Sequence, residues 1–141
     1  MTDFDGANFP TILTEFMDNG SLQDFMKRNK LTRTQQHILL LGISCGMNYL
    51  HSKSIIHRDL KPGNVLLNLL CHPYITDFGE SKRSDLALSE VQMGTYAGSP
   101  IYMAPEVSED DPYTYKADVY SFAILACEVM TMKEPYPGYK T

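Results

Sequence analysis

Cysteine is scarce in this sequence. The three cysteines, Cys45, Cys71 and Cys127, lie far apart and within apolar stretches. Three widely separated cysteines fit neither a disulfide framework nor the paired spacing of a structural zinc site. We therefore expect reduced, buried thiols of the kind found in cytosolic proteins.

Positive charge is also in short supply. The chain has 12 Lys and Arg residues against 17 Asp and Glu residues, which gives a formal net charge of -5. A basic surface is the usual footprint of a nucleic-acid-binding protein, and the one basic cluster here, over residues 27–33, is typical of a solvated helix end. The balance of charge predicts no nucleic-acid partner.

Long apolar runs are missing as well. The most apolar stretches, residues 38–43 and 122–130, are far shorter than the roughly 20 residues that cross a bilayer. Residues 1–10 have neither the basic start nor the apolar core of a signal peptide. These absences predict a cytoplasmic protein without a membrane span, and they leave its oligomeric state open.

The composition that remains is that of an ordinary globular chain. It has 43% hydrophobic and 21% charged residues in a length of 141, enough for one domain. β-prone residues predict a strand over 11–16, and a turn at 18–20 precedes a predicted helix over 21–27. Residues 80–98 are polar and lack periodicity, which indicates a loop.

Two longer helices follow from apolar residues spaced at three and four. The first covers residues 34–51 and the second covers residues 116–131, before the prolines at 135 and 137. On the first helix two apolar rows together indicate burial on a wide face: Leu39, Ile43, Met47 and Leu50, then Ile38, Leu41 and Cys45. On the second helix the predicted apolar side consists of Val119, Phe122, Ala123, Ala126 and Met130.

A hairpin is predicted between these helices. The apolar triplets at 65–67 and 74–76 are joined by six residues that include Pro73. Asn64 immediately precedes the first strand and Asp77 immediately follows the second. Because antiparallel strands return to the same end of a hairpin, we expect these two oxygen-bearing side chains to lie close together.

The residues around this hairpin form the most specific pattern in the chain. Residues 57–64 read HRDLKPGN, residues 77–79 read DFG and residues 104–106 read APE. This combination resembles the catalytic loop, the metal-binding motif and the adjoining motif of protein kinases. A single Asp in such a motif often only caps a turn, whereas the three motifs in this order arise by chance in well under about 1% of sequences.

The resemblance implies a site for ATP and magnesium. Asp59 would orient or deprotonate the substrate hydroxyl, Lys61 would approach the γ-phosphate, and Asn64 with Asp77 would hold Mg²⁺. Residues 14–21 resemble the kinase hinge. By that resemblance the gatekeeper is Thr14, the backbone groups that bind adenine belong to Glu15 and Met17, and the floor beneath the base is Leu66.

Other matches imply supporting and regulatory roles. His57 and Phe78 would stack on each other, and Asp118 would anchor the backbone of the catalytic loop. Arg58 would pair with a phosphorylated hydroxyl, for which Thr95 is the first choice. Two further positions match the family. Ser99 matches the residue that contacts the catalytic Asp and Lys. Glu106 matches a carboxylate that usually pairs with an arginine, and that arginine has no counterpart in this sequence.

The resemblance implies a fold and a range of functions. We expect an α+β fold, a mainly helical protein-kinase-like C-terminal lobe with short β-hairpins, and no small N-terminal lobe. Residues 1–141 would form a partial kinase domain: a leader over 1–10, strand and hinge over 11–20, and the helical lobe from 21. The motif residues most resemble those of serine/threonine kinases in the tyrosine-kinase-like branch. The implied function is phosphoryl transfer to a protein substrate; the alternatives are a non-catalytic interaction module and an unfolded fragment.

Overall fold

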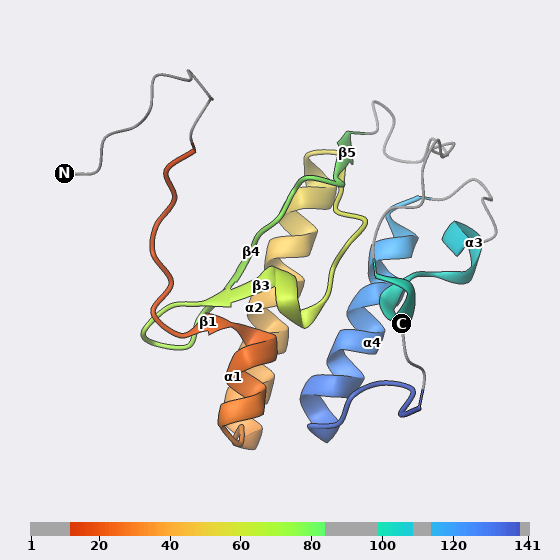
Figure 1. Cartoon of the computed structure of the whole chain (residues 1–141). Helices are drawn as coiled ribbons and strands as arrows, with labels where there is room; N and C mark the ends of the chain where they lie inside the picture. Colours follow the sequence, from red (N-terminus) through yellow and green to blue (C-terminus); the bar gives the residue numbers. More distant parts are fainter. Residues whose placement is uncertain (1–11, 84–98, 109–113, 139–141) are drawn as a thin grey trace, which may run out of the picture.

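The computed structural model describes residues 12–83, 99–108 and 114–138, and all structural statements refer to these. Its three longer helices are α1 (Leu22–Arg28), α2 (Arg33–Ser52) and α4 (Lys116–Thr131) (Figure 1). The short elements are β1 (Gly20–Ser21), β2 (Ile55–Ile56), β3 (Val65–Leu67), β4 (Pro73–Ile75), β5 (Lys82–Arg83), the 3₁₀ turns η1 (Pro62–Asn64) and η2 (Pro100–Tyr102), and α3 (Pro105–Ser108). The expected α+β fold, mainly helical with short antiparallel strands, is confirmed.

The helix predicted over 21–27 is α1, one residue displaced. Ser21 is its N-cap, and the Ser21 hydroxyl accepts a hydrogen bond from the backbone N–H of Asp24 (3.1 Å). The strand predicted over 11–16 is wrong for the described residues 12–16, which have no regular structure. Ile12, Leu13 and Phe16 are each more than 80% exposed, and β-prone residues form a strand only when a partner supplies hydrogen bonds and a packing surface.

The first long helix, α2, begins at a capping box formed by Thr32 and Gln35. Its predicted inner row is confirmed, because Leu39, Ile43, Met47 and Leu50 are all buried. The predicted second row is wrong: Ile38, Leu41 and Cys45 are exposed. One packed face is all that α2 buries here.

The β3–β4 hairpin lies against α2, and glycines permit the close approach (Figure 1). β3 also pairs with β1, so the three strands form one antiparallel sheet in the order β1-β3-β4. A Cβ atom at Gly42 would lie 2.5 Å from Cγ of Pro73, and one at Gly46 would lie 2.8 Å from Cδ1 of Ile75. Only residues without a side chain allow β4 to sit this close to the helix backbone.

The second long helix, α4, has the predicted bounds and packs beside α2. The Gln36 amide donates to the Val129 carbonyl (2.7 Å) and links the two helices. The predicted apolar face is confirmed only in part: Phe122 packs against the core and Ala126 is half-buried, but Val119, Ala123 and Met130 are exposed. The buried face instead carries Ala117, Asp118, Ser121, Leu125, Glu128 and Val129.

Two further sequence expectations can be compared with this fold. The expectation of buried thiols is wrong, since Cys45 and Cys127 are exposed and Cys71 is half-buried. In the part of the chain that is described, no helix combines the length and apolarity needed to span a bilayer.

Candidate active site

Asp118 holds the backbone of the 57–64 segment from the first turn of α4. Its carboxylate accepts the backbone N–H of His57 at Oδ2 and that of Arg58 at Oδ1, both at 2.9 Å. His51 at the end of α2 adds a third contact, Nε2 to Oδ2 at 2.8 Å. The side chain is 1% exposed, so one buried carboxylate joins two helices to the loop. Its position in the first turn of α4 also places it in the favourable field of the helix dipole.

Asp59 is the centre of a tight polar cluster. Its Oδ2 accepts from Lys61 Nζ (2.6 Å) and from Asn64 Nδ2 (2.8 Å), and its Oδ1 accepts from the backbone N–H of Ser99 (2.9 Å). Lys61 Nζ also donates to Ser99 Oγ (2.7 Å). The contact that the sequence predicts for Ser99 with Asp59 and Lys61 is therefore present. Three residues of the 57–64 motif and Ser99, some forty positions later, thus meet within hydrogen-bonding distance.

Asn64 and Asp77 are brought to one end of the hairpin, as predicted. The pairs Val65↔Ile75, Leu66↔Tyr74 and Leu67↔Pro73 fix the register, and Thr76 N–H donates to the Asn64 carbonyl (3.0 Å) just beyond it. Asp77 follows in the left-handed backbone region (φ 61°).

The residues at this end fit a magnesium ion that takes its other ligands from outside the protein. Asn64 Nδ2 donates to both the carbonyl and the carboxylate of Asp59, which leaves the amide oxygen as the remaining acceptor. An amide oxygen and a carboxylate suit Mg²⁺, which usually has few protein ligands and keeps phosphate and water oxygens. The described residues contain no group of three His, Cys, Asp or Glu that could hold a metal unaided.

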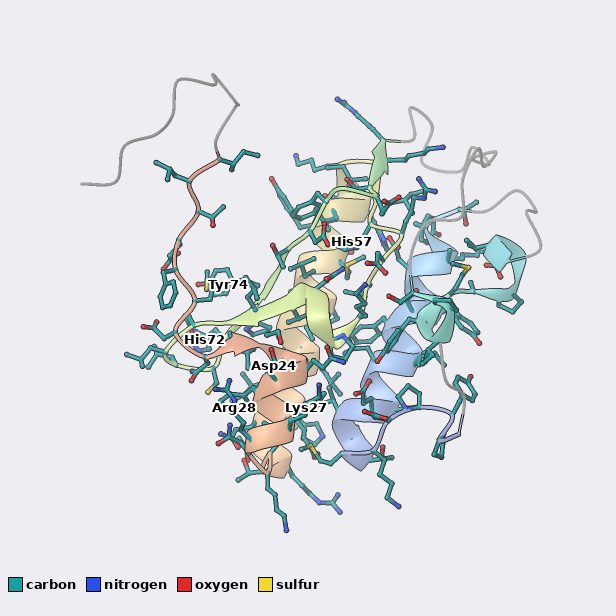
Figure 2. The ribbon with its side chains drawn as sticks, in the orientation of Figure 1. Asp24, Lys27, Arg28, His57, His72 and Tyr74 are labelled. Carbon is teal, nitrogen blue, oxygen red and sulfur yellow. The ribbon has the colours of Figure 1, made fainter. Side chains whose placement is uncertain are left out.

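His57, which is labelled in Figure 2, is fully buried, and its ring contacts the ring of Phe78. Their ring centroids are 5.3 Å apart at an interplanar angle of 59°, an edge-to-face range that aromatic pairs favour. His57 Nδ1 accepts the Asp59 backbone N–H (3.3 Å), so the ring proton belongs on Nε2, which donates to the Thr76 carbonyl (3.0 Å). A neutral imidazole in this tautomer satisfies both nitrogens.

Of the remaining positions with predicted regulatory or supporting roles, Arg58 and Glu106 lie among the described residues. Arg58 has a positive φ of 73° and its Nη1 donates to the Glu80 carbonyl (3.1 Å). Glu106 is half-buried on α3, and no ion pair to it is present among the described residues. The modification site predicted at Thr95 lies outside the described residues.

The hinge residues are not brought to this cluster. Thr14 and Glu15 are exposed, and Figure 1 shows the segment that carries them running from β1 away from the helices. The Met17 carbonyl accepts the Gly20 N–H (3.1 Å) in a turn. Leu66, half-buried in β3, lies opposite Ser21 of β1. The pairing of β1 with β3 therefore places the turn at 17–20 next to the predicted adenine floor, whereas Thr14 lies outside this pairing.

Sequence reasoning missed a pair beside the cluster. The Tyr102 hydroxyl of η2 donates to Glu128 Oε2 of α4 (2.6 Å), and the Ser121 hydroxyl donates to the Tyr102 carbonyl (2.7 Å). Burial, and then the bond to Glu128, raise the pKa of Tyr102 well above its usual value. Burial raises the pKa of Glu128, and the carboxylate of Glu134 adds to this while the Tyr102 bond opposes it. The sequence signal that could have indicated this pair is the single charged residue, Glu128, among the apolar residues of 126–129.

Comparison with known proteins agrees with this geometry. The model of the protein kinase domain matches residues 4–141. The chain belongs to the protein kinase family. A kinase-like arrangement of Asp59, Lys61, Asn64 and Asp77 is therefore found in a kinase sequence, and α4 with its Asp118 lies inside the matched region.

Similar proteins are named as serine/threonine kinases. The chain is 44% identical over 88% of its length to RGS domain-containing serine/threonine-protein kinase A of Dictyostelium discoideum and covers 11% of that protein. It is 41% identical over 89% of its length to serine/threonine-protein kinase STY17 of Arabidopsis thaliana and covers 22% of it. A third relative, serine/threonine/tyrosine-protein kinase HT1 of Arabidopsis thaliana, is 40% identical over 90% of the chain, which covers 33% of it. The chain thus spans between about a tenth and a third of these relatives.

Proposed function

We propose that the protein carrying this chain is a serine/threonine protein kinase that transfers the γ-phosphoryl group of ATP to a hydroxyl of a protein substrate. The observation that carries the proposal is the cluster at Asp59, where a carboxylate, an ammonium group and an amide converge. Phosphoryl transfer needs positioning and charge stabilisation more than covalent chemistry from the enzyme. This cluster offers both.

Asp59 orients the attacking hydroxyl. Its Oδ2 is held by Lys61 and Asn64 and its Oδ1 by the Ser99 N–H, so the carboxylate has one fixed orientation. The bond from the β–γ bridging oxygen to the γ-phosphorus breaks as the hydroxyl oxygen bonds to that phosphorus, and Asp59 accepts the hydroxyl proton. The products are ADP and the phosphorylated protein.

Lys61 lies beside Asp59 and Ser99, with about a quarter of its side chain exposed. Its ammonium group stabilises negative charge on the transferred phosphoryl group. The lysine two residues after the catalytic Asp, with a hydroxyl at Ser99, supports serine or threonine as the acceptor, as do the names of the relatives.

Asn64 and Asp77 would hold Mg²⁺, which when bound would neutralise charge on the phosphate oxygens. The antiparallel register that brings these residues together supports this assignment. By the resemblance to the kinase hinge, the adenine would lie over Leu66 and bond to backbone groups of Glu15 and Met17, next to Thr14. When Thr95 is phosphorylated, the guanidinium group of Arg58 pairs with the phosphate. The protein acts in the cytoplasm.

Asp59→Asn in the complete native polypeptide tests the proposal. Asparagine keeps the shape but cannot accept the proton, so transfer to a protein substrate should fall by about 10²- to 10⁴-fold. Binding of a fluorescent ATP analogue should change little, because the nucleotide contacts lie elsewhere. Undiminished transfer by the variant would overturn the role of Asp59 and, with it, the proposed mechanism.

A further inference from the structure

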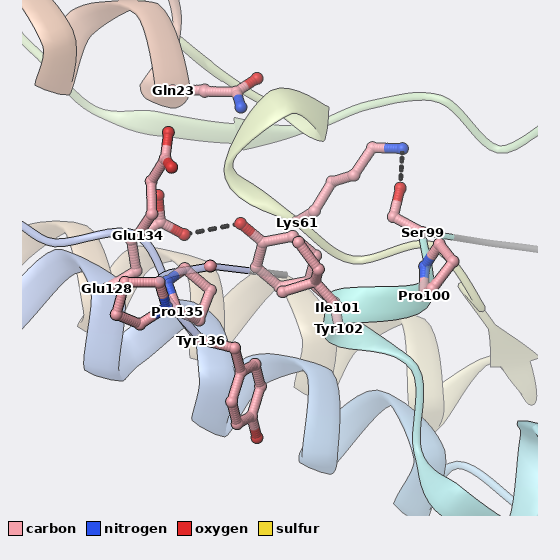
Figure 3. Close-up of a pocket in the computed structure, with 12 residues that line it drawn as sticks. Gln23, Lys61, Ser99, Pro100, Ile101, Tyr102, Glu128, Glu134, Pro135 and Tyr136 are labelled. Carbon is pink, nitrogen blue, oxygen red and sulfur yellow. Dashed lines mark hydrogen bonds between the residues drawn. The ribbon is translucent and has the colours of Figure 1, made fainter. Parts of the chain in front are cut away.

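The hydroxyl of Ser99 lies inside the catalytic cluster. Its oxygen accepts a hydrogen bond from Lys61 Nζ (2.7 Å), and Figure 3 shows this bond, with Pro100 directly after Ser99 in the chain. The Ser99 backbone N–H donates to Asp59 Oδ1 (2.9 Å). A serine hydroxyl of this chain is therefore fixed beside the carboxylate and the ammonium group to which the proposed mechanism assigns phosphoryl transfer.

Asp59 and the Ser99 hydroxyl each keep unused hydrogen-bonding capacity. Among the described residues the Ser99 N–H is the one donor to Asp59 Oδ1, so a lone pair of that oxygen remains. The Ser99 hydroxyl accepts from Lys61, and its own proton has no acceptor in the described part of the chain. Because the hydroxyl and the N–H belong to one residue, a change of Ser99 rotamer brings the hydroxyl proton toward Oδ1. Asp59 can thus act as base for Ser99 as it does for a separate substrate.

The chain after Ser99 holds this hydroxyl in place. Pro100 restricts Ser99 to an extended backbone (φ -93°, ψ 121°). The Ser99 carbonyl accepts the Tyr102 N–H (3.0 Å), and Tyr102 is in turn bonded to Glu128 and Ser121 of α4. Ser99 also lines an open cavity of about 650 Å³, so its hydroxyl is not sealed off. Fixed positioning of this kind favours an intramolecular reaction.

We propose that Ser99 is a self-phosphorylation site, at which the active site modifies its own chain and switches itself off. The proposal rests on the proposed kinase function and adds a means of regulation to it. The Ser99 oxygen bonds to the γ-phosphorus of ATP as the bond from that phosphorus to the β–γ bridging oxygen breaks, and the Ser99 proton passes to Asp59. The products are ADP and a phosphoserine in the chain.

A phosphate on Ser99 disables the cluster through its charge. It carries about -1.5 to -2 elementary charges at neutral pH and three acceptor oxygens. The Lys61 ammonium group, already in contact with the Ser99 oxygen, pairs with this phosphate and is withdrawn from the γ-phosphate of the next ATP. The Asp59 carboxylate, bonded to the N–H of the same residue, then lies beside a second anion that also repels the phosphates of ATP.

The test uses the complete native polypeptide, treated with a phosphatase that is then removed, and ATP labelled in its γ-phosphate. Mass spectrometry should find the label on Ser99, and its rate of gain per molecule should not change when the protein is diluted about tenfold, as for an intramolecular reaction. Transfer to a separate serine peptide should fall by about 10²-fold as Ser99 becomes phosphorylated, the effect of losing one charge-stabilising donor. Asp59→Asn should gain no label on Ser99.

Variants separate the modification from a purely structural role of Ser99. Ser99→Thr keeps a hydroxyl and should retain both the label and the decline in peptide transfer. Ser99→Ala has no acceptor, so its rate of peptide transfer, whatever its starting value, should stay constant during incubation with ATP. Ser52→Ala removes an exposed hydroxyl at the end of α2. It is the matched control and should decline as the wild-type protein does.

The outcomes distinguish this inference from the proposed function. Label that is absent from Ser99 while the peptide is phosphorylated would overturn the inference and leave the kinase function standing. Label on Ser99 that is gained faster per molecule at higher protein concentration, or that leaves peptide transfer undiminished, would also overturn it. Absence of transfer to both the peptide and Ser99 would reject the kinase function and the inference with it.

Discussion

The catalytic segment 57–64 differs sharply in how it is held from residues 12–17, which include the start of the predicted hinge and are called the hinge segment below. In the catalytic segment Asp59, Lys61 and Asn64 bond to one another, and Asp118 fixes the backbone ahead of them. In the hinge segment five of the six side chains are exposed. Both segments resemble kinase motifs, so a motif alone does not indicate how firmly its residues are positioned.

The difference lies in the partners that these residues find within the described chain. The catalytic segment packs between α2, α4 and the hairpin, all of which are present. Residues 12–16 of the hinge segment are exposed, and the chain is tied to the fold just beyond the segment, where the Asn19 amide donates to the Asn68 carbonyl (2.7 Å). The catalytic geometry therefore belongs to this part of the fold itself, whereas residues 12–16 are not held in place by it.

Removing the Asp118 carboxylate should have the largest effect on this comparison. Asp118→Ala leaves two backbone N–H groups and His51 without their acceptor, so the free energy of unfolding should fall by about 3 to 5 kcal/mol. Urea denaturation followed by circular dichroism measures it. Asp18→Ala, at an exposed acid, is the control and should change the value by less than about 0.5 kcal/mol. Equal losses in the two variants would mean that Asp118 does not anchor the loop.

A methyl group at Gly42 should have an intermediate effect, on the hairpin that aligns Asn64 with Asp77. Gly42→Ala gains up to about 1 kcal/mol of helix propensity but forces a Cβ against the rigid ring of Pro73, which costs about 1 to 3 kcal/mol. We expect a net loss of stability in thermal denaturation. Gly46→Ala, which meets the mobile end of Ile75, should lose less. A stabilised Gly42→Ala would show that β4 can move away from α2.

Shortening a side chain in the hinge segment should have the smallest effect on the free energy of unfolding. Phe16 is 82% exposed, so Phe16→Ala should change the free energy of unfolding of the chain by less than about 0.5 kcal/mol. Leu39→Ala, at a buried position in α2, should lower it by about 2 to 5 kcal/mol. Urea denaturation of both variants provides the measurement. A comparable loss at Phe16 would place the hinge segment in the core and remove the contrast between the two segments.

Sequence periodicity predicted where the helices lie better than which faces they bury. The bounds of α4 follow from a long apolar run and the prolines after it, but its buried face includes Asp118, Ser121 and Glu128. Hydrophobicity alone cannot identify buried polar residues, since their burial depends on partners such as Tyr102 and the His57 backbone that are distant in sequence. The strand expected at 11–16 failed for a related reason, since local preference supplied no partner strand.

For the candidate site, the motif spacing predicted the meeting of Asn64 and Asp77 because two short strands and a tight register leave no other arrangement. The contact of Ser99 with Asp59 and Lys61 could be anticipated only from family resemblance, since some forty residues separate them. The Tyr102–Glu128 pair was not predicted, because η2 and α4 meet only in three dimensions.

The three bonds to Asp118 also bear on the order of folding. Each of them closes a stretch of 60 to 67 residues. The chain entropy lost in closing so long a loop must be overcome before the contact can stabilise the fold. α2 can form from local contacts, whereas the catalytic segment reaches its final shape only once the start of α4 has docked. We therefore expect this segment to reach its competent shape late in folding, when it is completed by a residue that has no part in the chemistry.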